Sequence, residues 1–250
     1  MPPRPPRDLD WEGCLNVRDL GGQPTTDGGE TLYRRVIRAD SMRNLTERGW
    51  QAALAYGVRT VIDLRHAEER QTDPPGTLPV EVVEAPFFEL DEEVLAELDA
   101  VAVAAADDAA ATRDVYLVFL ERFRPNVARA VAAVADAPEG AVVVHCVGGK
   151  DRTGLVSAFL LDLADVSREQ IADDYARSAV RLEPRHRRWL AEARSAEERA
   201  RLARIVATPR RALLETLAEI ERRYGSLRDY LRAGGLQAET LAGARARLRG

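Results

Sequence analysis

The chain has 250 residues, of which 46% are hydrophobic and 31% are charged, and its formal net charge is −5. This composition excludes a disordered chain, and the length is sufficient to bury a substantial core. The acidic balance argues against general binding to nucleic acids.

The first residues predict a flexible arm before one folded unit. Residues 1–10 start with Met-Pro-Pro-Arg-Pro-Pro-Arg and lack the apolar segment of a conventional signal peptide. Residues 11–250 are expected to form a single domain. No uncharged apolar run is long enough to cross a bilayer. The expected location is therefore the cytoplasm, with export by a signal-independent route left open.

Short apolar segments alternate with helical ones along the first two thirds of the chain. The predicted strands are Leu32–Arg38, Val58–Leu64, Val80–Ala85 and Ala141–His145. The predicted helices are Thr46–Tyr56, ending at Gly57, then Thr112–Phe123, Pro125–Ala135 and a buried central helix over 153–163, with a loop at 73–76. This alternation predicts an α/β fold with a central parallel or mixed sheet flanked by helices. After Ser167 the pattern predicts an almost wholly helical C-terminal half.

Two segments carry concentrated charge. Residues 89–114 hold nine acidic residues and predict an acidic helical insertion, whereas residues 181–211 hold ten arginines against four glutamates. Two solvated helical faces would explain both segments. The alternative is a functional role, in which the arginines attract anionic substrates or acidic lipid surfaces and the acidic helix pairs with the basic one.

The most informative segment is His145-Cys146-Val147-Gly148-Gly149-Lys150-Asp151-Arg152-Thr153-Gly154. It joins the end of a predicted strand to the start of a predicted helix, where free backbone N–H groups and the helix dipole favour an anion. The two glycines allow the backbone to bend tightly around a phosphate. The spacing alone is weak in so arginine-rich a chain, but the strand, the glycines and the helix start together predict a phosphate site with a thiolate at its floor.

The residue types in this segment suggest their tasks. Cys146 is the candidate nucleophile, because a helix N-terminus and a nearby cation lower the pKa of a thiol. Arg152 offers a planar fork that matches two phosphate oxygens. Asp151 is the first candidate for the acid that protonates the leaving oxygen and then activates water. The remaining candidates for phosphate binding are Val147, Gly148, Gly149, Lys150 and Thr153.

Further expectations concern single side chains of the segment. Thr153 could donate its hydroxyl to the sulfur, and His145 is expected to orient the loop through a backbone bond. Lys150 is the only lysine in a chain rich in arginine, which singles it out as a source of positive charge at the rim.

Other cysteines and histidines give no sign of a disulfide or a metal site. Cys14 is the only other cysteine, which we expect to be packed rather than redox-active. The three histidines are far apart in the sequence. We therefore expect no cofactor and no metal.

The ten-residue segment resembles the signature of the atypical bacterial tyrosine phosphatases that carry His-Cys-x-x-Gly-Lys-Asp-Arg-Thr-Gly. Modest matches follow in the family's order along nearly the whole chain, at 16–22, 38–41, 57–65, 173–175 and 224–231. The resemblance implies a cysteine-phosphatase-like fold and a metal-free phosphatase that acts on phosphotyrosine. Phosphoserine, phosphothreonine and phosphoinositides are further substrate classes that it implies. The resemblance also suggests that the arginine-rich helical segment 181–211 is a lid over the pocket, which the acidic helix would hold shut.

The sequence contains no Trp-Pro-Asp, the usual mobile-acid signature of eukaryotic tyrosine phosphatases. The acid must therefore come from elsewhere, and Asp63 is the second candidate after Asp151 because it ends a predicted strand. The competing role for Asp63 is that of an ion-pair partner for Arg65.

Two other classes of protein remain as alternatives. One is a non-catalytic phosphate-binding module, although nucleophile, arginine and acid are all present. The other is a different thiol enzyme, either a sulfurtransferase, which usually has a shorter loop, or an arsenate reductase, which needs resolving cysteines. The expected partner is a phosphorylated protein or a phosphoinositide, and the oligomeric state is left open.

Overall fold

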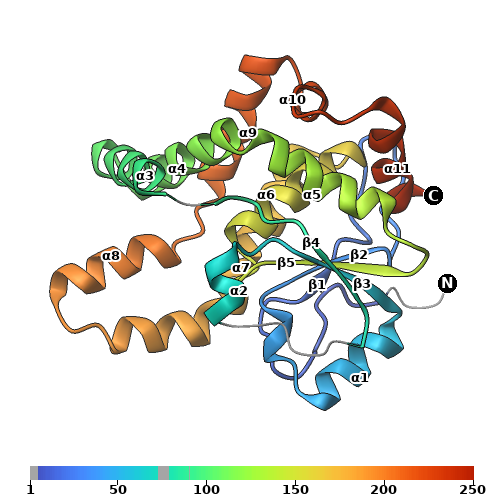
Figure 1. The fold of residues 1–250 in the computed structure, drawn as a ribbon, viewed down its shortest axis with the longest axis horizontal. Coiled ribbons are helices and arrows are strands. Elements are labelled where there is room, and N and C mark those ends of the chain that lie inside the picture. Colours follow the sequence, from blue (N-terminus) through green and yellow to red (C-terminus); the bar gives the residue numbers. More distant parts are fainter. Residues whose placement is uncertain (1–4, 73–78, 90) are drawn as a thin grey trace.

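The computed structural model describes residues 5–72, 79–89 and 91–250, which form a five-stranded sheet covered by helices on both faces (Figure 1). The strands are β1 (Arg18–Asp19), β2 (Val36–Ala39), β3 (Val58–Asp63), β4 (Glu81–Glu84) and β5 (Ala141–His145). The α-helices are α1 (Glu47–Tyr56), α2 (Ala67–Thr72), α3 (Glu92–Ala104), α4 (Asp108–Arg122), α5 (Arg124–Asp136), α6 (Asp151–Leu163), α7 (Arg168–Ala191), α8 (Ala196–Val206), α9 (Arg210–Tyr224), α10 (Leu227–Ala233) and α11 (Ala238–Arg249), with a short 3₁₀ turn over Met42–Asn44. The expected α/β fold with a helical C-terminal half is confirmed.

The sheet is mixed and has β5 at its centre. Its order is β1-β2-β5-β3-β4, with β1 antiparallel to β2 and all other neighbours parallel. In this register His145 lies opposite both Ala39 and Asp63. The carboxyl ends of three parallel strands therefore meet at one edge, which is where open α/β sheets bind their ligands.

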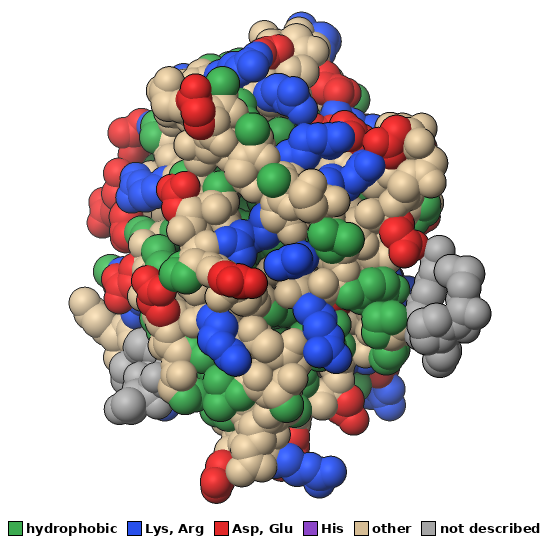
Figure 2. All heavy atoms as spheres, turned by 90° about the vertical axis from the view of Figure 1, so that its right-hand side faces the viewer, with side chains coloured by type: hydrophobic (Ala, Val, Ile, Leu, Met, Phe, Trp, Pro, Cys, Tyr) green, Lys and Arg blue, Asp and Glu red, His purple; other side chains and the backbone are tan. Residues whose placement is uncertain are grey.

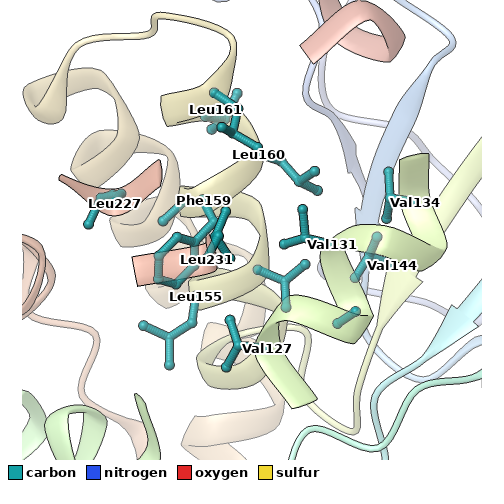
Figure 3. Packing of buried hydrophobic residues seen from close by; sticks show 14 of the residues in the cluster. Val127, Val131, Val134, Val144, Leu155, Phe159, Leu160, Leu161, Leu227 and Leu231 are labelled. Atoms are coloured by element: carbon teal, nitrogen blue, oxygen red, sulfur yellow. The ribbon is translucent and has the colours of Figure 1, made fainter. Parts of the chain in front are cut away.

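Alternate residues of β5 enter two different cores, as the period of a strand requires. Val142 and Val144 belong to the larger core, which is formed with α5, α6 and the C-terminal helices, and Figure 3 shows Val144 close to Val131 and Val134 of α5. Ala141 and Val143 belong to the smaller core on the side of α1. Residues of α6 are buried on nearly every face, as its sequence predicts.

Local chemistry explains the bounds of α1. The Thr46 hydroxyl accepts a hydrogen bond from the Gly49 N–H at 3.2 Å, which satisfies one free donor of the first turn. Gly57 ends the helix with a φ of 107°, which a residue without a Cβ adopts easily. The predicted helix with its end at Gly57 is confirmed.

The structure differs from the expectations near the N-terminus. The strand predicted over Leu32–Arg38 is confirmed only from Val36, because Arg34 takes a φ of 61° and turns the chain before it. Residues 5–10 do not form a loose arm. Asp8 makes an isolated bridge with Arg18, and Leu9 is buried.

Two predictions concern residues that the structure does not describe. They are the loop at 73–76 and residues 1–4 of the flexible arm. The short helix α2 was not predicted at all. Among the described residues, no helix is long and apolar enough to cross a membrane.

The charged segments are mostly paired within their own neighbourhood. Glu93 and Glu97 of α3 bind Arg122 of α4, while Asp107 binds Arg211 across to α9 with a 2.6 Å contact. On the face drawn in Figure 2, positive and negative side chains are interspersed rather than gathered into a patch of one sign.

Candidate active site

The loop from Cys146 to Lys150 begins where β5 ends and closes where α6 begins. Cys146 directly follows the last residue of β5 and is 2% exposed. The free N–H groups and the positive dipole end of α6 lie next to this loop, and both favour an anion bound within it.

A glycine is required at position 149. Its φ is 62°, and a Cβ at this position would lie 2.3 Å from the carbonyl oxygen of Ala39. The loop therefore packs backbone against backbone on the end of β2, which no larger residue would allow.

Two side chains hold the loop from behind. The Asn16 amide donates to the carbonyl oxygens of Gly148 and Gly149 at 3.1 and 3.0 Å, and Arg38 donates to the Gly149 oxygen at 2.8 Å. Because the C=O and N–H of a peptide point in opposite directions, this contact turns the N–H groups of Gly149 and Lys150 toward the interior of the loop.

A buried ion-pair network anchors these side chains. Asp174 of α7 contacts Arg38 at 2.8 Å and Arg18 at 3.1 Å, and Arg18 donates in turn to the Asn16 side chain at 2.6 Å. Arg18, Arg38 and Asp174 are all essentially inaccessible. Burial would raise the pKa of Asp174, but the neighbouring guanidinium groups outweigh it and hold that pKa well below its usual range.

Arg152 reaches the site from the first turn of α6 and is 8% exposed. Both of its terminal nitrogens donate to the Glu69 carboxylate of α2, with the Nη2–Oε1 distance at 2.7 Å. Its guanidinium also lies over the Phe88 ring, 4.8 Å from the centroid. Within the described part of the chain no hydrogen bond reaches Nε, so this edge of the fork is available to an anion.

The charge of Arg152 is well stabilised. Burial would lower its pKa, but the interactions with Cys146 and with the Glu69 carboxylate outweigh burial and raise it. Burial likewise would raise the pKa of Glu69, and the hydrogen bond from Arg152 reverses this and lowers it. Both partners are therefore ionised at neutral pH.

Asp151 is the first residue of α6, and its side chain is 42% exposed. Its Oδ1 accepts the hydroxyl of Tyr116 from α4, and the same hydroxyl lies 2.8 Å from that of Tyr175 on α7. The Lys150 ammonium is 3.3 Å from Oδ1. The carboxyl group thus sits between a buried tyrosine pair and a cation.

The ammonium of Lys150 does not extend from the rim into solvent. Lys150 is 6% exposed, and Nζ donates to the carbonyl oxygens of Ile205 and Ala207, the latter at 2.9 Å. These carbonyls belong to the C-terminal end of α8, whose dipole favours a cation. Lys150 therefore links the loop to α8.

A family model described as "Tyrosine phosphatase family" matches residues 9–250. The chain belongs to the tyrosine phosphatase family. It is 29% identical over 265 positions to the "Triple specificity protein phosphatase PtpB" of Mycobacterium tuberculosis, covering 92% of this chain and 94% of that protein. It is also 31% identical over 147 residues to a "Tyrosine-protein phosphatase" of Nostoc commune. That match covers 59% of this chain and only 49% of the relative, so the chain aligns with about half of its length.

The family assignment confirms the resemblance found in the sequence and the enzyme class, a cysteine-dependent phosphatase. Within residues 5–72, 79–89 and 91–250, no three His, Cys, Asp or Glu side chains come together as a set of metal ligands.

The second candidate acid lies in an ion pair. Asp63 accepts hydrogen bonds from Nε and Nη2 of Arg65, the latter at 2.8 Å, and both residues are buried. Burial would raise the pKa of Asp63, but the hydrogen bonds and the positive charge of Arg65 outweigh burial and lower that pKa. A carboxyl held in this way is a poor source of a proton, so the geometry favours the structural role for Asp63.

His145, at the end of β5, and Thr153, in the first turn of α6, are both buried. Nδ1 of His145 lies 3.0 Å from the Cys146 carbonyl oxygen, and burial lowers the pKa of the ring, so the imidazole is neutral. The Thr153 hydroxyl is fully buried and has no hydrogen-bond partner among the described residues. It is therefore available to the sulfur.

The sequence did not point to several residues that the fold brings to the loop. Glu69, Tyr116 and Tyr175 come from helices distant in sequence, and Phe88 follows β4. Glu69 lies in a helix of only six residues, which has no apolar periodicity to reveal it. Tyr175 falls within a segment matched to the family, but nothing in its sequence neighbourhood indicates a contact with Asp151.

Proposed function

We propose that this family member hydrolyses phosphomonoesters, phosphotyrosine first among them, through a cysteinyl-phosphate intermediate. The observation that supports this most strongly is the loop itself. A buried thiol follows the end of β5, the carbonyl contacts behind the loop turn its N–H groups inward, and Arg152 in the first turn of α6 has a free Nε among the described residues.

The chemistry needs two steps. In the first, the Cys146 thiolate attacks phosphorus, the S–P bond forms as the P–O bond breaks, and Asp151 gives its proton to the leaving oxygen. In the second, the Asp151 carboxylate takes a proton from water, the water oxygen attacks phosphorus, and the S–P bond breaks to regenerate the thiolate. Arg152 and the loop N–H groups bind the equatorial oxygens in both steps, and the Thr153 hydroxyl assists departure of the sulfur.

The experiment uses an aryl phosphate with two variants. Cys146→Ser should reduce turnover to less than about one hundredth of wild type, because a serine hydroxyl ionises far less readily than a thiol and is a much weaker nucleophile. Arg152→Lys should lose about 100- to 1,000-fold in kcat/KM, because an ammonium cannot reproduce the fork. Full activity of either variant would reject the proposal, as would failure to find phosphate on Cys146 by mass spectrometry of trapped enzyme.

The substrate range is a second part of the proposal. The relative from Mycobacterium tuberculosis is named a triple specificity phosphatase, which supports testing phosphotyrosine, phosphoserine and phosphothreonine peptides beside phosphoinositides. If the protein releases phosphate from none of these substrates, the phosphatase proposal is wrong. The alternatives are then a phosphate-binding module or another thiol enzyme. A cytoplasmic location and the absence of nucleic-acid partners stay predictions.

We also propose that the segment 181–211 acts as a lid, within a single domain over 11–250 that carries an acidic insertion at 89–114. The contact of Lys150 with the end of α8 supports this, because it connects the segment directly to the loop. Salt links to the acidic insertion are few and exposed, so they would add little to closure. Unchanged turnover of a small aryl phosphate after deletion of 92–110 would count against a part for the insertion in gating.

A further inference from the structure

The hydroxyl groups of two buried tyrosines form a hydrogen-bonded chain that ends at the carboxyl group of Asp151. Tyr116 and Tyr175 are 2% and 1% exposed, and their hydroxyl oxygens are 2.8 Å apart. The Tyr116 hydroxyl donates its single hydrogen to Oδ1 of Asp151. Tyr175 must therefore donate to Tyr116, which gives a chain of hydrogen bonds running from Tyr175 through Tyr116 to Asp151.

The helix α6 is shaped to admit this chain. A Cβ at Gly154 would lie 2.9 Å from Cδ2 of the Tyr175 ring, so only glycine lets the ring approach. The Tyr116 and Tyr175 rings meet edge to face, with centroids 6.2 Å apart, which fixes both hydroxyls in position. The last glycine of the signature segment thus has a specific task, which is to make room for Tyr175.

We propose that Tyr116, supported by Tyr175, is a positioning residue that fixes the orientation and the protonation of the Asp151 carboxyl group during catalysis. The proposal rests on the function proposed above, because it acts through Asp151. The Tyr116 bond occupies Oδ1, and no hydrogen bond among the described residues reaches Oδ2, so Oδ2 carries the transferred proton. Donation from a neutral hydroxyl stabilises the carboxylate form, and a chain of two donors polarises this bond further.

Other charged groups also act on Asp151. The Lys150 ammonium lies 3.3 Å from Oδ1 of Asp151, and Arg152 is the next residue after Asp151 on α6. His186 of α7 also interacts electrostatically with Asp151. Burial raises the pKa of both tyrosines, so their hydroxyls remain donors throughout the working range of the enzyme. Replacing one tyrosine leaves the other charged groups in place and isolates the effect of the hydroxyl.

The test compares the pH profiles of kcat for Tyr116→Phe and wild type. Without the donor the Asp151 carboxylate is less stable, so Asp151 keeps its proton to higher pH. We expect the limb that reports its ionisation to move upward by about 0.5–1 pH unit, the equivalent of one hydrogen bond. With a substrate that has a poor leaving group, Asp151 must be protonated to assist its departure, so the descending limb of the profile should move. With a good leaving group, the Asp151 carboxylate must activate water in the second step, so the ascending limb should move.

Tyr230→Phe is the matched control. Tyr230 is also fully buried, and its hydroxyl donates to the Leu120 carbonyl at 2.7 Å, away from Asp151. Its loss should leave the limbs of the profile where they are. Thermal unfolding of both variants separates a loss of folding from a change in the site.

The double variant decides between the proposals. In an Asp151→Asn background, Tyr116→Phe should have no further effect on the sensitivity to the leaving group. If Asp151→Asn itself leaves this sensitivity unchanged, the proposed acid is wrong. If Asp151→Asn changes it but Tyr116→Phe shifts neither limb, the acid stands and the inference about Tyr116 is overturned.

Discussion

The loop that begins at Cys146 is held differently on its two sides. Behind it, Asn16, Arg38 and Asp174 are inaccessible and form a continuous network of short hydrogen bonds. In front, Arg152 is bound by Glu69, whose side chain is 22% exposed, and Asp151 is 42% exposed. The rear contacts cannot exchange with water, whereas the front contacts can.

This difference separates support from reaction. Buried charges that lose a partner have no solvent to replace it, so the rear network fixes one shape for the loop. Charged groups at a solvated front can change partner at small cost, which a phosphate needs when it enters and leaves. Substitutions behind the loop should therefore affect folding most, and those in front should affect ligand binding.

The largest effect is expected for Asp174→Asn. It leaves Arg18 and Arg38 buried without a counter-charge, so we expect a loss of about 3–5 kcal/mol in the free energy of unfolding. Denaturation by urea at neutral pH measures it. Asp107→Asn, which removes the charge from the exposed pair with Arg211, should change the stability far less and is the control.

The loss of stability in Asp174→Asn should depend on pH. Because the pKa of Asp174 is lower in the folded protein than in the unfolded chain, its stabilisation is complete above the unfolded value of about 3.9. It decreases as the pH falls from there toward the lower folded value. The stability difference between wild type and Asp174→Asn should therefore shrink below that pH, and a constant difference would contradict the assignment.

Gly149→Ala should have the next largest effect, on activity. The new Cβ would clash with the Ala39 carbonyl and displace the loop from its seat on β2, so kcat should fall on the order of 100-fold. Steady-state kinetics on an aryl phosphate measure this. Gly235→Ala is the control, because its φ is also positive, at 105°, but nothing lies within 4 Å of the new methyl group. Equal losses in both variants would show that strain alone, and not the contact with β2, is responsible.

The smallest effect is expected in front of the loop, for Glu69→Gln. The amide keeps the shape of the side chain but removes a negative charge that opposes the phosphate dianion at Arg152. Inhibition by inorganic phosphate should become up to about five-fold tighter, with little change in stability. Added salt should reduce the difference between variant and wild type.

Glu68→Gln changes the same charge on the exposed side of α2 and should leave phosphate binding unaltered. Weaker inhibition in Glu69→Gln than in wild type would mean that Glu69 chiefly orients Arg152, which would place it with the supporting contacts.

Local sequence was sufficient to predict the centre of this site. The apolar run Ala141–His145 matches β5 residue for residue, and the glycines and the following helix lie where the pattern indicates. A strand, a tight loop and a helix start depend on neighbouring residues, whose propensities can be read along the chain.

The contacts around the centre could not be predicted in this way. Glu69 reaches Arg152 across 83 positions, and Tyr116 reaches Asp151 across 35. Such contacts depend on how helices pack on the sheet, and their own sequence segments show no sign of it. The turn at Arg34 could not be predicted for a similar reason. A positive φ at a residue other than glycine is imposed by its surroundings, which the local sequence does not reveal.

Lys150 supplies the only side-chain amine of the whole chain, and its nitrogen is held by two carbonyls at the end of α8. A reagent that acylates amines can therefore mark one side-chain nitrogen besides the α-amino group of the chain, and it reaches that nitrogen only after those two bonds open. The rate at which this side-chain nitrogen is labelled therefore reports how readily α8 separates from the loop. It can be measured on the intact protein, with no residue replaced to carry a label.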